Sequence, residues 1–316
     1  MNIILVTGGT GLVGHGIKQI LKTNNYTNYN KRNKFIFLSS KDCDLENEEK
    51  VKELFNNYKP NYVIHLAAYV GGLYRNMKEK VEMFEKNIKI NLNVIKNCHK
   101  FNVKKLICCL STCIFPDNIQ YPINEDMLHN GPPHNSNDAY AYAKRMMEIH
   151  CNTYKEQYNC NFMCIIPTNI YGPNDNFSLE NGHVIPAIIH KCYISKLESK
   201  PLIVFGSGKP KRQFIYSHDL GKIIIKLLLD YKKNDSIIIS PNEEVEIKYI
   251  AEILLKHTKL EKGIEYDRNF SDGQYKKTAS NKRLLDLFPD FKFTPLNKGL
   301  KNTYDWFSEN YKLARK

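Results

Sequence analysis

Tyr140 and Lys144 stand four residues apart in the stretch "YAYAK". On a helix this spacing places both side chains on one face. A lysine ammonium beside a phenol stabilises the phenolate and lowers its pKa, so Tyr140 could act as an acid or base near neutral pH. Pairs of this kind are common in helices, and the interpretation needs support from elsewhere in the chain.

Ser111 provides that support, because it directly follows the apolar stretch "KKLICCL", which predicts a strand over residues 104–110. In an open α/β sheet, ligands bind at the carboxyl ends of the strands. We therefore expect Ser111 and Tyr140 to converge there. Ser111 would donate a hydrogen bond to a substrate carbonyl while Tyr140 delivers a proton.

A glycine-rich loop follows the first apolar stretch, and Gly8, Gly11 and Gly14 have the spacing G-x-x-G-x-x-G. The loop lies between a strand predicted at residues 2–6 and a helical stripe, the context that a dinucleotide-binding loop requires. Gly8 would form the tight turn, Gly11 would let the backbone approach a pyrophosphate, and Gly14 would let helix and strand pack closely. The positive end of the helix would face the phosphates. The alternative is a purely structural turn.

The end of the second predicted strand carries Ser39, Ser40 and Lys41. A site for NAD places a carboxylate there to hold the ribose hydroxyls, whereas hydroxyls and a cation suit the 2′-phosphate of NADP. Asp42, one residue further on, leaves room for the opposite interpretation. Asp44 could meet the adenine, or it could cap the helix that "ENEEKVKELF" predicts.

Apolar strands at residues 2–6, 35–38, 62–68, 104–110 and 161–167 alternate with helical stretches, among them residues 81–100. This alternation predicts right-handed βαβ units and a doubly wound parallel sheet, the Rossmann arrangement. After Pro167 the chain is rich in Asn, Gly and Pro, with shorter strands and helices. We expect a dinucleotide-binding domain at 1–166 and a smaller α/β substrate lobe at 167–316, with some elements crossing back.

The 316 residues are 42% hydrophobic and 25% charged, as in ordinary soluble domains. No apolar run approaches ~18 residues, and no signal peptide is recognisable, so we expect a cytoplasmic protein without a membrane span. The net charge of +13 could indicate an RNA- or nucleotide-binding protein. The lysines are spread along the chain without a basic block, which favours anionic small molecules over nucleic acid.

Nine cysteines occur without a C-x-x-C pair or a zinc-ligand spacing, so free thiols and no metal are expected. Cys108 and Cys109 are neighbours in a predicted strand and should pack on opposite faces of the sheet. Cys113 lies beyond the strand end, two residues after Ser111. His129 and His134 are interpreted as loop residues without a metal-ligand pattern.

The stretches "TGGTGLVG", "HLAAYVGG", "LSTCIFP", "YAYAK" and "IPTNIYGPNDNF" together resemble the extended branch of the short-chain dehydrogenase/reductase superfamily. Within that branch, "HNGPPHNSN", "GHVIPAIIHK", "GSGKPKRQFIYSHDL" and "SDGQYKKTASN" resemble the GDP-L-fucose synthase family, and the motifs run in order through the whole chain. Dehydratases of the branch carry Thr-Asp-Glu where this chain has Thr112, Cys113 and Ile114. Simple 4-epimerases need no additional acid/base pair, which Cys113 and His183 would supply.

The resemblance implies C3/C5 epimerisation of GDP-4-keto-6-deoxy-D-mannose and then reduction at C4 with NADPH. Cys113 would be the base and His183 the acid, unless His183 only caps the helix that follows it. The implied cofactor-binding residues are Gly8, Gly11, Leu12, Val13, Gly14, Ser39, Ser40, Lys41, Asp44, Leu66, Ala67, Ala68, Leu110, Lys144, Pro167, Thr168, Asn169 and Ile170, with Asn87 as a further candidate.

The same resemblance assigns the second lobe to GDP. Lys191 and Arg212 would bind the diphosphate, Phe205 would lie beside the guanine, and Asp272 would contact the substrate. For the two cations the alternative is a solvated surface charge. Relatives of this kind imply a homodimer that pairs through the helices near residues 81–100 and 140–155. Another NADP-dependent sugar-nucleotide epimerase or reductase is the alternative within the superfamily.

Overall fold

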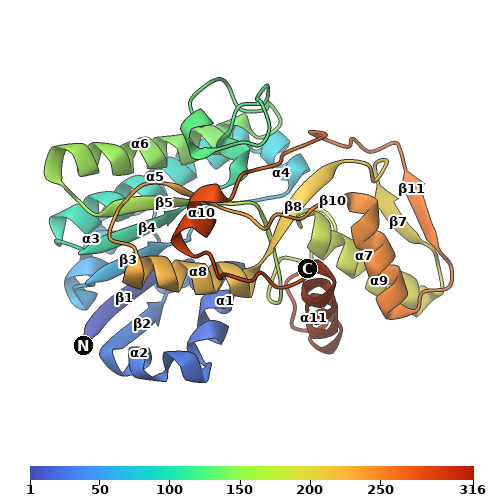
Figure 1. The fold of residues 1–316 in the computed structure, drawn as a ribbon, viewed down its shortest axis with the longest axis horizontal. Helices are drawn as coiled ribbons and strands as arrows, with labels where there is room; N and C mark the ends of the chain where they lie inside the picture. The colour runs from blue at the N-terminus through green and yellow to red at the C-terminus, as the bar shows by residue number, and fades with distance from the viewer.

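The computed structural model describes residues 1–316, the side chain of Tyr74 excepted (Figure 1). Its N-terminal part is built on a parallel six-stranded sheet with the order β2-β1-β3-β4-β5-β9. The strands are β1 (Asn2–Thr7), β2 (Asn33–Phe37), β3 (Tyr62–His65), β4 (Lys105–Cys109), β5 (Phe162–Pro167) and β9 (Ile237–Ile239). The strand order reverses direction between β1 and β3, where a doubly wound sheet binds its ligands.

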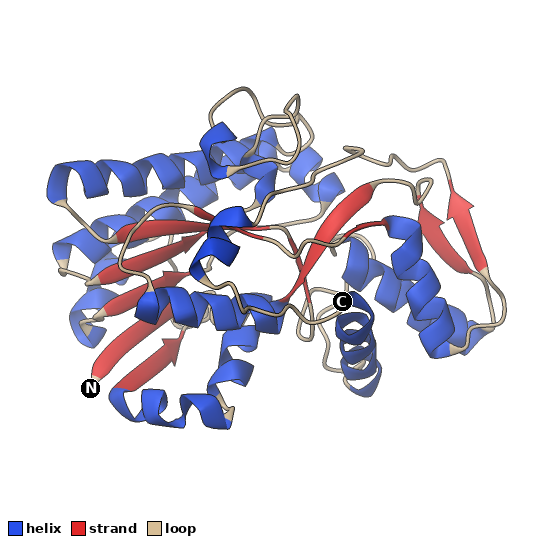
Figure 2. Cartoon of the chain, viewed as in Figure 1, coloured by secondary structure: helices blue, strands red, loops and turns tan.

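Helices cover both faces of this sheet, as the Rossmann arrangement predicts (Figure 2). One face packs against α3 (Glu48–Tyr58), α5 (Lys80–Lys100) and α6 (Asp138–Tyr158), and the other against α1 (Leu12–Leu21) and α8 (Ser217–Asp230), while the short α2 (Thr27–Arg32) precedes β2. Cys108 belongs to the first of these cores and Cys109 to the second, as expected for neighbours in a strand.

The chain after residue 167 builds the smaller lobe, seen at the right of Figure 1. It holds a sheet of β10, β8 and β6 and a parallel pair of β11 and β7. These strands are β6 (Asn169–Tyr171), β7 (Leu202–Phe205), β8 (Lys211–Tyr216), β10 (Glu244–Glu246) and β11 (Ile264–Asp267), with helices α7 (Val184–Glu198), α9 (Ile247–Thr258) and α11 (Leu296–Glu309). Buried side chains from all three helices form its separate core.

Three segments beyond residue 167 return to the first lobe. Strand β9 pairs with β5, and α8 packs on α1 so closely that a methyl group on Gly16 would lie 2.3 Å from the carbonyl oxygen of Ser217. The short α10 (Lys282–Leu287) also contributes Leu284 to the core beneath that face. We therefore propose residue 167 only as the start of the substrate lobe, because the lobes exchange elements after it.

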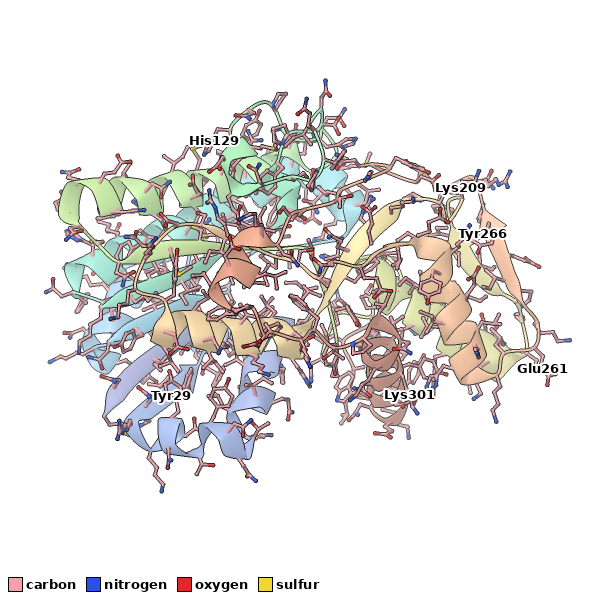
Figure 3. The ribbon with its side chains drawn as sticks, viewed as in Figure 1. Tyr29, His129, Lys209, Glu261, Tyr266 and Lys301 are labelled. Carbon is pink, nitrogen blue, oxygen red and sulfur yellow. The ribbon has the colours of Figure 1, made fainter. Side chains whose placement is uncertain are left out.

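Figure 3 shows the positions of Lys209, Tyr266 and His129, three residues that lie outside the main cavity. Lys209 and Tyr266 lie at the far end of the smaller lobe, and His129 lies in the loop before α6. His129 pairs through Nε2 with an Oε2 of Glu148 at 3.0 Å and does not line the cavity described below. No helix in the described part of the chain is long and apolar enough to cross a membrane.

Candidate active site

The phosphate-binding loop joins β1 to α1, and its backbone accepts only glycine at two points. Gly8 has φ +65°, and a methyl group there would lie 2.7 Å from the backbone nitrogen of Ala67. At Gly14 a methyl group would lie 2.4 Å from the carbonyl oxygen of Gly9. Gly11 is the N-cap of α1, so no side chain competes with an anion for the amides of the first helical turn. This cradle fits a dinucleotide pyrophosphate.

The other predicted cofactor residues lie at the same edge of the sheet. Leu12 and Val13 begin α1, Leu66, Ala67 and Ala68 follow β3, and Leu110 follows β4. Pro167 ends β5, Thr168 comes next, and Asn169 and Ile170 begin β6. Thr7 and His65, which sequence reasoning missed, tie two of these strand ends together. Thr7 Oγ1 lies 2.7 Å from His65 Nδ1 and accepts a hydrogen bond from the amide of Ala67.

The turn after β2 resolves one alternative about the acidic residues. Asn47, not Asp44, caps α3, since its Oδ1 accepts from the amide of Lys50 at 3.0 Å. Asp44 instead accepts from the amide of Glu46 and remains exposed. The capping interpretation of Asp44 is therefore wrong.

Asp42 turns its carboxylate back onto the same turn. Its Oδ2 accepts from the amide of Ser39 at 2.7 Å and from the Ser39 hydroxyl at 2.6 Å. These hydrogen bonds lower the pKa of Asp42. Ser40 and Lys41 are exposed beside this turn. We propose that Lys41 would meet a 2′-phosphate, because the Asp42 carboxylate already accepts hydrogen bonds from Ser39.

Asn87, a further cofactor candidate, is fully buried in α5. Its Oδ1 accepts from the amide of Tyr69, and its Nδ2 donates to the carbonyls of Tyr69 and Met83. These bonds fix the loop that follows β3. Asn87 therefore stabilises the loop at the cofactor edge of the sheet without itself being exposed there.

A cavity of about 740 Å³ opens beside that edge, between the two lobes. The side chains expected to do chemistry line it together: Ser111, Cys113, Tyr140 and His183. Ser111 follows β4 and caps a short turn at Thr112–Ile114, where its Oγ accepts from the amide of Cys113 at 3.4 Å. The fold thus brings together residues from the turn after β4, from α6 and from the segment before α7.

Tyr140 and Lys144 share one face of α6, with the Lys144 Nζ 5.8 Å from the centroid of the Tyr140 ring. The expectation that Lys144 lowers the pKa of Tyr140 is wrong for the free protein. Burial, with Cys113 and Cys109 nearby, raises the pKa of Tyr140 well above its ordinary value. Burial also lowers the pKa of Lys144, whose Nζ donates to the Cys109 carbonyl at 2.8 Å. In the free protein Tyr140 is therefore held as the neutral phenol.

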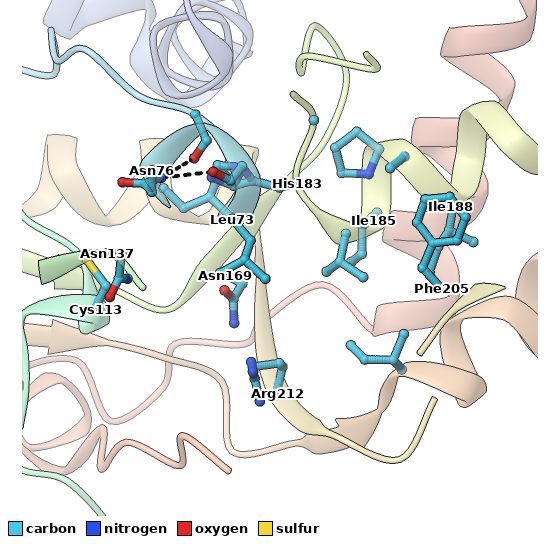
Figure 4. A pocket seen from close by; sticks show the side chains of 18 of the residues that line it. Leu73, Asn76, Cys113, Asn137, Asn169, His183, Ile185, Ile188, Phe205 and Arg212 are labelled. Carbon is cyan, nitrogen blue, oxygen red and sulfur yellow. Dashed lines mark hydrogen bonds between the residues drawn. The ribbon is translucent and has the colours of Figure 1, made fainter. Parts of the chain in front are cut away.

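His183 occupies the N-cap position of α7, but its side chain makes no capping hydrogen bond. Figure 4 shows His183 at the cavity, near Asn76. The side chain is open to the cavity, yet the surrounding walls lower its pKa by desolvation. A proton that His183 gives to a substrate must then be taken up from solvent, which its exposed position permits.

The far end of the cavity is cationic and aromatic. The Lys191 Nζ lies 2.8 Å from the centroid of the Phe205 ring, which stacks on Phe270 at 3.7 Å. Arg212 is held by donating to the Gln274 and Lys211 carbonyls. Burial lowers the pKa of both cations, that of Lys191 to about 8.

Asp272 lies in the wall of an adjoining pocket of about 280 Å³. Its two carboxylate oxygens accept from the amide and hydroxyl of Ser207, at 2.7 and 2.6 Å. His134 also lines this pocket, with its Nδ1 2.7 Å from the Ser136 hydroxyl. In the free protein, Asp272 therefore holds the turn at 206–209.

The sequence matches a model of the NAD dependent epimerase/dehydratase family over residues 4–240. It is 49% identical over 315 residues to GDP-L-fucose synthase of Dictyostelium discoideum, covering 99% of this chain and 97% of that one. This chain belongs to the GDP-L-fucose synthase family. A probable GDP-L-fucose synthase of Drosophila melanogaster is 42% identical, with both chains covered completely.

A solved structure supports the same placement in the GDP-L-fucose synthase family. The GDP-L-fucose synthetase of Naegleria fowleri bound to NADP superimposes with a TM-score of 0.93. It is 43% identical in sequence, and the match covers 100% of this chain and 96% of that one.

Sequence reasoning missed one cation that lines the cavity, Lys277. Lys277 reaches both pockets from the segment after β11. The pKa of Lys277 is lowered, chiefly by burial and also by the neighbouring Arg212. Cys113 and Asp117 oppose this shift only in part. Its only signal in the sequence was its place in "SDGQYKKTASN", where nothing separates it from the surface lysines around it.

Gly11→Ala should weaken NADPH binding at least about tenfold while barely changing the melting temperature. A methyl group at Gly11 meets only the Gly8 carbonyl oxygen, at 3.2 Å, but it would occupy the space that phosphates must enter. Gly14→Ala is the matched control and should lower the melting temperature, because its methyl group collides with Gly9. Fluorescence titration with NADPH and thermal unfolding measure both effects. Unchanged affinity in Gly11→Ala would place the pyrophosphate elsewhere.

Proposed function

We infer that this chain acts as an NADPH-dependent GDP-L-fucose synthase. It epimerises GDP-4-keto-6-deoxy-D-mannose at C3 and C5 and then reduces C4. The observation that carries this proposal is full-length membership of the family combined with Ser111, Cys113, Tyr140 and His183 around one cavity. A dehydratase would need carboxylates where this chain has Cys113 and Ile114.

Epimerisation begins with a carbon acid, because a proton on a carbon next to the C4 ketone is acidic. The Cys113 thiolate accepts this proton and becomes a thiol, and the carbon's electron pair moves into an enolate. The hydroxyls of Ser111 and Tyr140 donate hydrogen bonds to the enolate oxygen. His183 then gives a proton to the opposite face of the carbon, which inverts it. The sequence of proton transfers runs once at C3 and once at C5.

Reduction at C4 uses the same hydrogen bonds. Bound NADPH supplies the hydride. Tyr140 gives its phenolic proton to the C4 oxygen. The raised pKa of Tyr140 keeps this proton on the phenol until the C4 oxygen becomes basic enough to take it. Ser111 would hold the oxygen in place, and Lys144, whose Nζ donates to the Cys109 carbonyl, would orient the nicotinamide ribose.

The cationic end of the cavity suits the GDP moiety. We propose that Lys191 and Arg212 bind the diphosphate, with the exposed edge of Phe205 beside the guanine. Arginine is well suited to phosphate because its guanidinium can donate to two oxygens. Asp272 would contact the substrate through the turn that it shapes with Ser207.

Binding of GDP should weaken as pH rises through about 8, because the Lys191 ammonium loses its proton there. A single titration of this kind makes the dissociation constant about tenfold larger at pH 9 than at pH 7. Lys191→Arg keeps the charge over this range and should flatten the curve. Calorimetric titration of GDP between pH 7 and 9 measures both. A wild-type curve that matches the Lys191→Arg curve would exclude Lys191 from the diphosphate site.

Purified protein incubated with GDP-4-keto-6-deoxy-D-mannose and NADPH tests the function directly. NMR should identify GDP-L-fucose as the product. A C4-reduced product without inversion would favour another sugar-nucleotide reductase. Tight, salt-dependent RNA binding without turnover would favour the nucleic-acid interpretation of the +13 charge.

We also propose a homodimer that pairs through α5 and α6. These two neighbouring helices expose large apolar side chains, namely Phe84, Leu92, Tyr142, Met146 and Ile149. Large apolar side chains exposed on two neighbouring helices are what we would expect of a surface that pairs with a second copy. Light scattering after gel filtration should give twice the chain mass of 36.8 kDa, and Leu92→Glu with Met146→Glu should give a monomer.

We place the protein in the cytoplasm, where its nine free thiols would stay reduced.

A further inference from the structure

The segment that carries His183 into the cavity is held by a turn from the other lobe. Between β6 and α7 the chain runs as loops and turns, and His183 is its last residue before the helix. The amide of Gly72 donates to the carbonyl of Asn181 at 3.2 Å. A methyl group on Gly72 would lie 3.0 Å from the carbonyl oxygen of Gly182. The backbone at Gly72 therefore sets the approach of the two residues that precede His183.

Asn76 holds this turn from the first lobe. It lies in α4 (Leu73–Lys78), lines the cavity and is nine-tenths buried. Its Nδ2 donates to the carbonyls of Gly71 and Gly72, at 2.8 and 3.0 Å, and Figure 4 shows both bonds. Turning the amide over would place Oδ1 against two carbonyl oxygens, so the orientation of the side chain is determined.

We propose that Asn76 is a positioning residue for His183, acting through Gly71, Gly72 and the backbone at 181–182. The proposal rests on the proposed function, in which His183 returns a proton to carbon. Such a transfer needs heavy atoms within about 3 Å, and a misplacement of about 1 Å can cost about 100-fold in rate. Asn76 itself is not required to touch the substrate.

Asn76 differs from a helix-stabilising asparagine in what its contacts hold, although its bond to Gly72 also spans four residues. Both of its donors are directed at one turn, and this turn contacts the segment that carries His183. Its Oδ1 accepts no hydrogen bond from the described side chains or backbone. Asn97 offers the comparison, because it is also buried in a helix and its Nδ2 donates to a carbonyl four residues earlier, that of Asn93, at 2.8 Å. Asn97 does not line the cavity.

Asn76→Asp tests the proposal, since it replaces the two donors by an oxygen that the Gly71 and Gly72 carbonyls repel. Uptake of solvent deuterium at C3 and C5 should slow by about 10- to 100-fold. Affinity for NADPH should stay within about twofold, because the phosphate loop is untouched. A growing share of the C4-reduced product should keep the substrate's configuration. Asn97→Asp, the matched control, should leave deuterium uptake and product configuration unchanged.

Combination with His183→Asn separates positioning from general damage. If Asn76 acts through His183, then Asn76→Asp should slow deuterium uptake by less than about twofold in the His183→Asn background. Should Asn76→Asp fail to fold, Gly72→Ala tests the same contact between Gly72 and residues 181–182. It presses a methyl group onto the Gly182 carbonyl and should produce the same defect.

Three results would overturn the proposal. The first is wild-type deuterium uptake in Asn76→Asp or, where that variant does not fold, in Gly72→Ala. The second is an equal defect in Asn97→Asp. The third is a full additional defect in the His183→Asn background. In all three the wild-type protein still makes GDP-L-fucose, so the proposed function stands. A wild-type protein that converts no substrate overturns the proposed function, and the positioning role with it.

Discussion

Tyr140→Phe is expected to slow reduction at C4 by about 10²- to 10⁴-fold, the usual contribution of a positioned general acid. Burial raises the pKa of Tyr140 and keeps its phenol neutral, and Tyr140 is the one described residue of α6 that lines the cavity. Deuterium uptake at C3 and C5 should be slowed less, because Cys113 and His183 carry those proton transfers. The decay of NADPH absorbance and NMR of the sugar ring measure the two reactions separately.

Tyr142→Phe is the matched control for this prediction. Tyr142 lies two residues further along α6, belongs to the proposed dimer face and does not line the cavity. Loss of its hydroxyl should leave both rates unchanged. Equal rates of C4 reduction in Tyr140→Phe and Tyr142→Phe would mean that the proton for C4 comes from another group.

Cys113→Ala is expected to lower deuterium uptake at C3 and C5 by at least about 100-fold, because the base that starts each inversion is gone. NADPH binding should be retained, since Cys113 lies outside the phosphate loop. Reduction at C4 keeps its acid, so the product should be a C4-reduced sugar with uninverted carbons. Solvent exchange followed by NMR and mass spectrometry reports each step.

Cys160→Ala serves as the control for Cys113→Ala. Cys160 is a partly exposed thiol 3.4 Å from the His99 Nδ1, outside the cavity. Its removal should leave uptake at the wild-type rate. If Cys113→Ala also exchanges at the wild-type rate, Cys113 only packs like Cys108, and the base lies elsewhere.

Local patterns in the sequence predicted the cofactor edge and one half of the catalytic cavity. The spacing of Gly8, Gly11 and Gly14 acts within one strand–turn–helix unit, so its consequences can be read from neighbouring residues. The four-residue spacing of Tyr140 and Lys144 and the place of Ser111 after a strand are equally local. Parallel strands bring their carboxyl ends to one edge, which is why these stretches, distant in sequence, could be expected together.

The tertiary structure decided everything that depends on burial or on contacts across the lobes. The pKa of Tyr140 rises because the cavity walls desolvate it, which the neighbouring Lys144 does not offset. Lys277 becomes part of the cavity only because the segment after β11 folds back over it. Asn47, and not Asp44 three residues earlier, caps α3, because the backbone geometry at the start of the helix selects one of several suitable side chains.

The hydrogen bonds from Asn76 to the turn at Gly71 and Gly72, which contacts the segment before His183, also depend on the tertiary structure. The turn is local to α4, but the contact from Gly72 to Asn181 joins residues that are far apart in the chain. A sequence specifies which donors and acceptors exist, and close-range spacing specifies those that meet within one element. Which of them meet across two lobes depends on how the two cores pack, and this is a property of the whole fold.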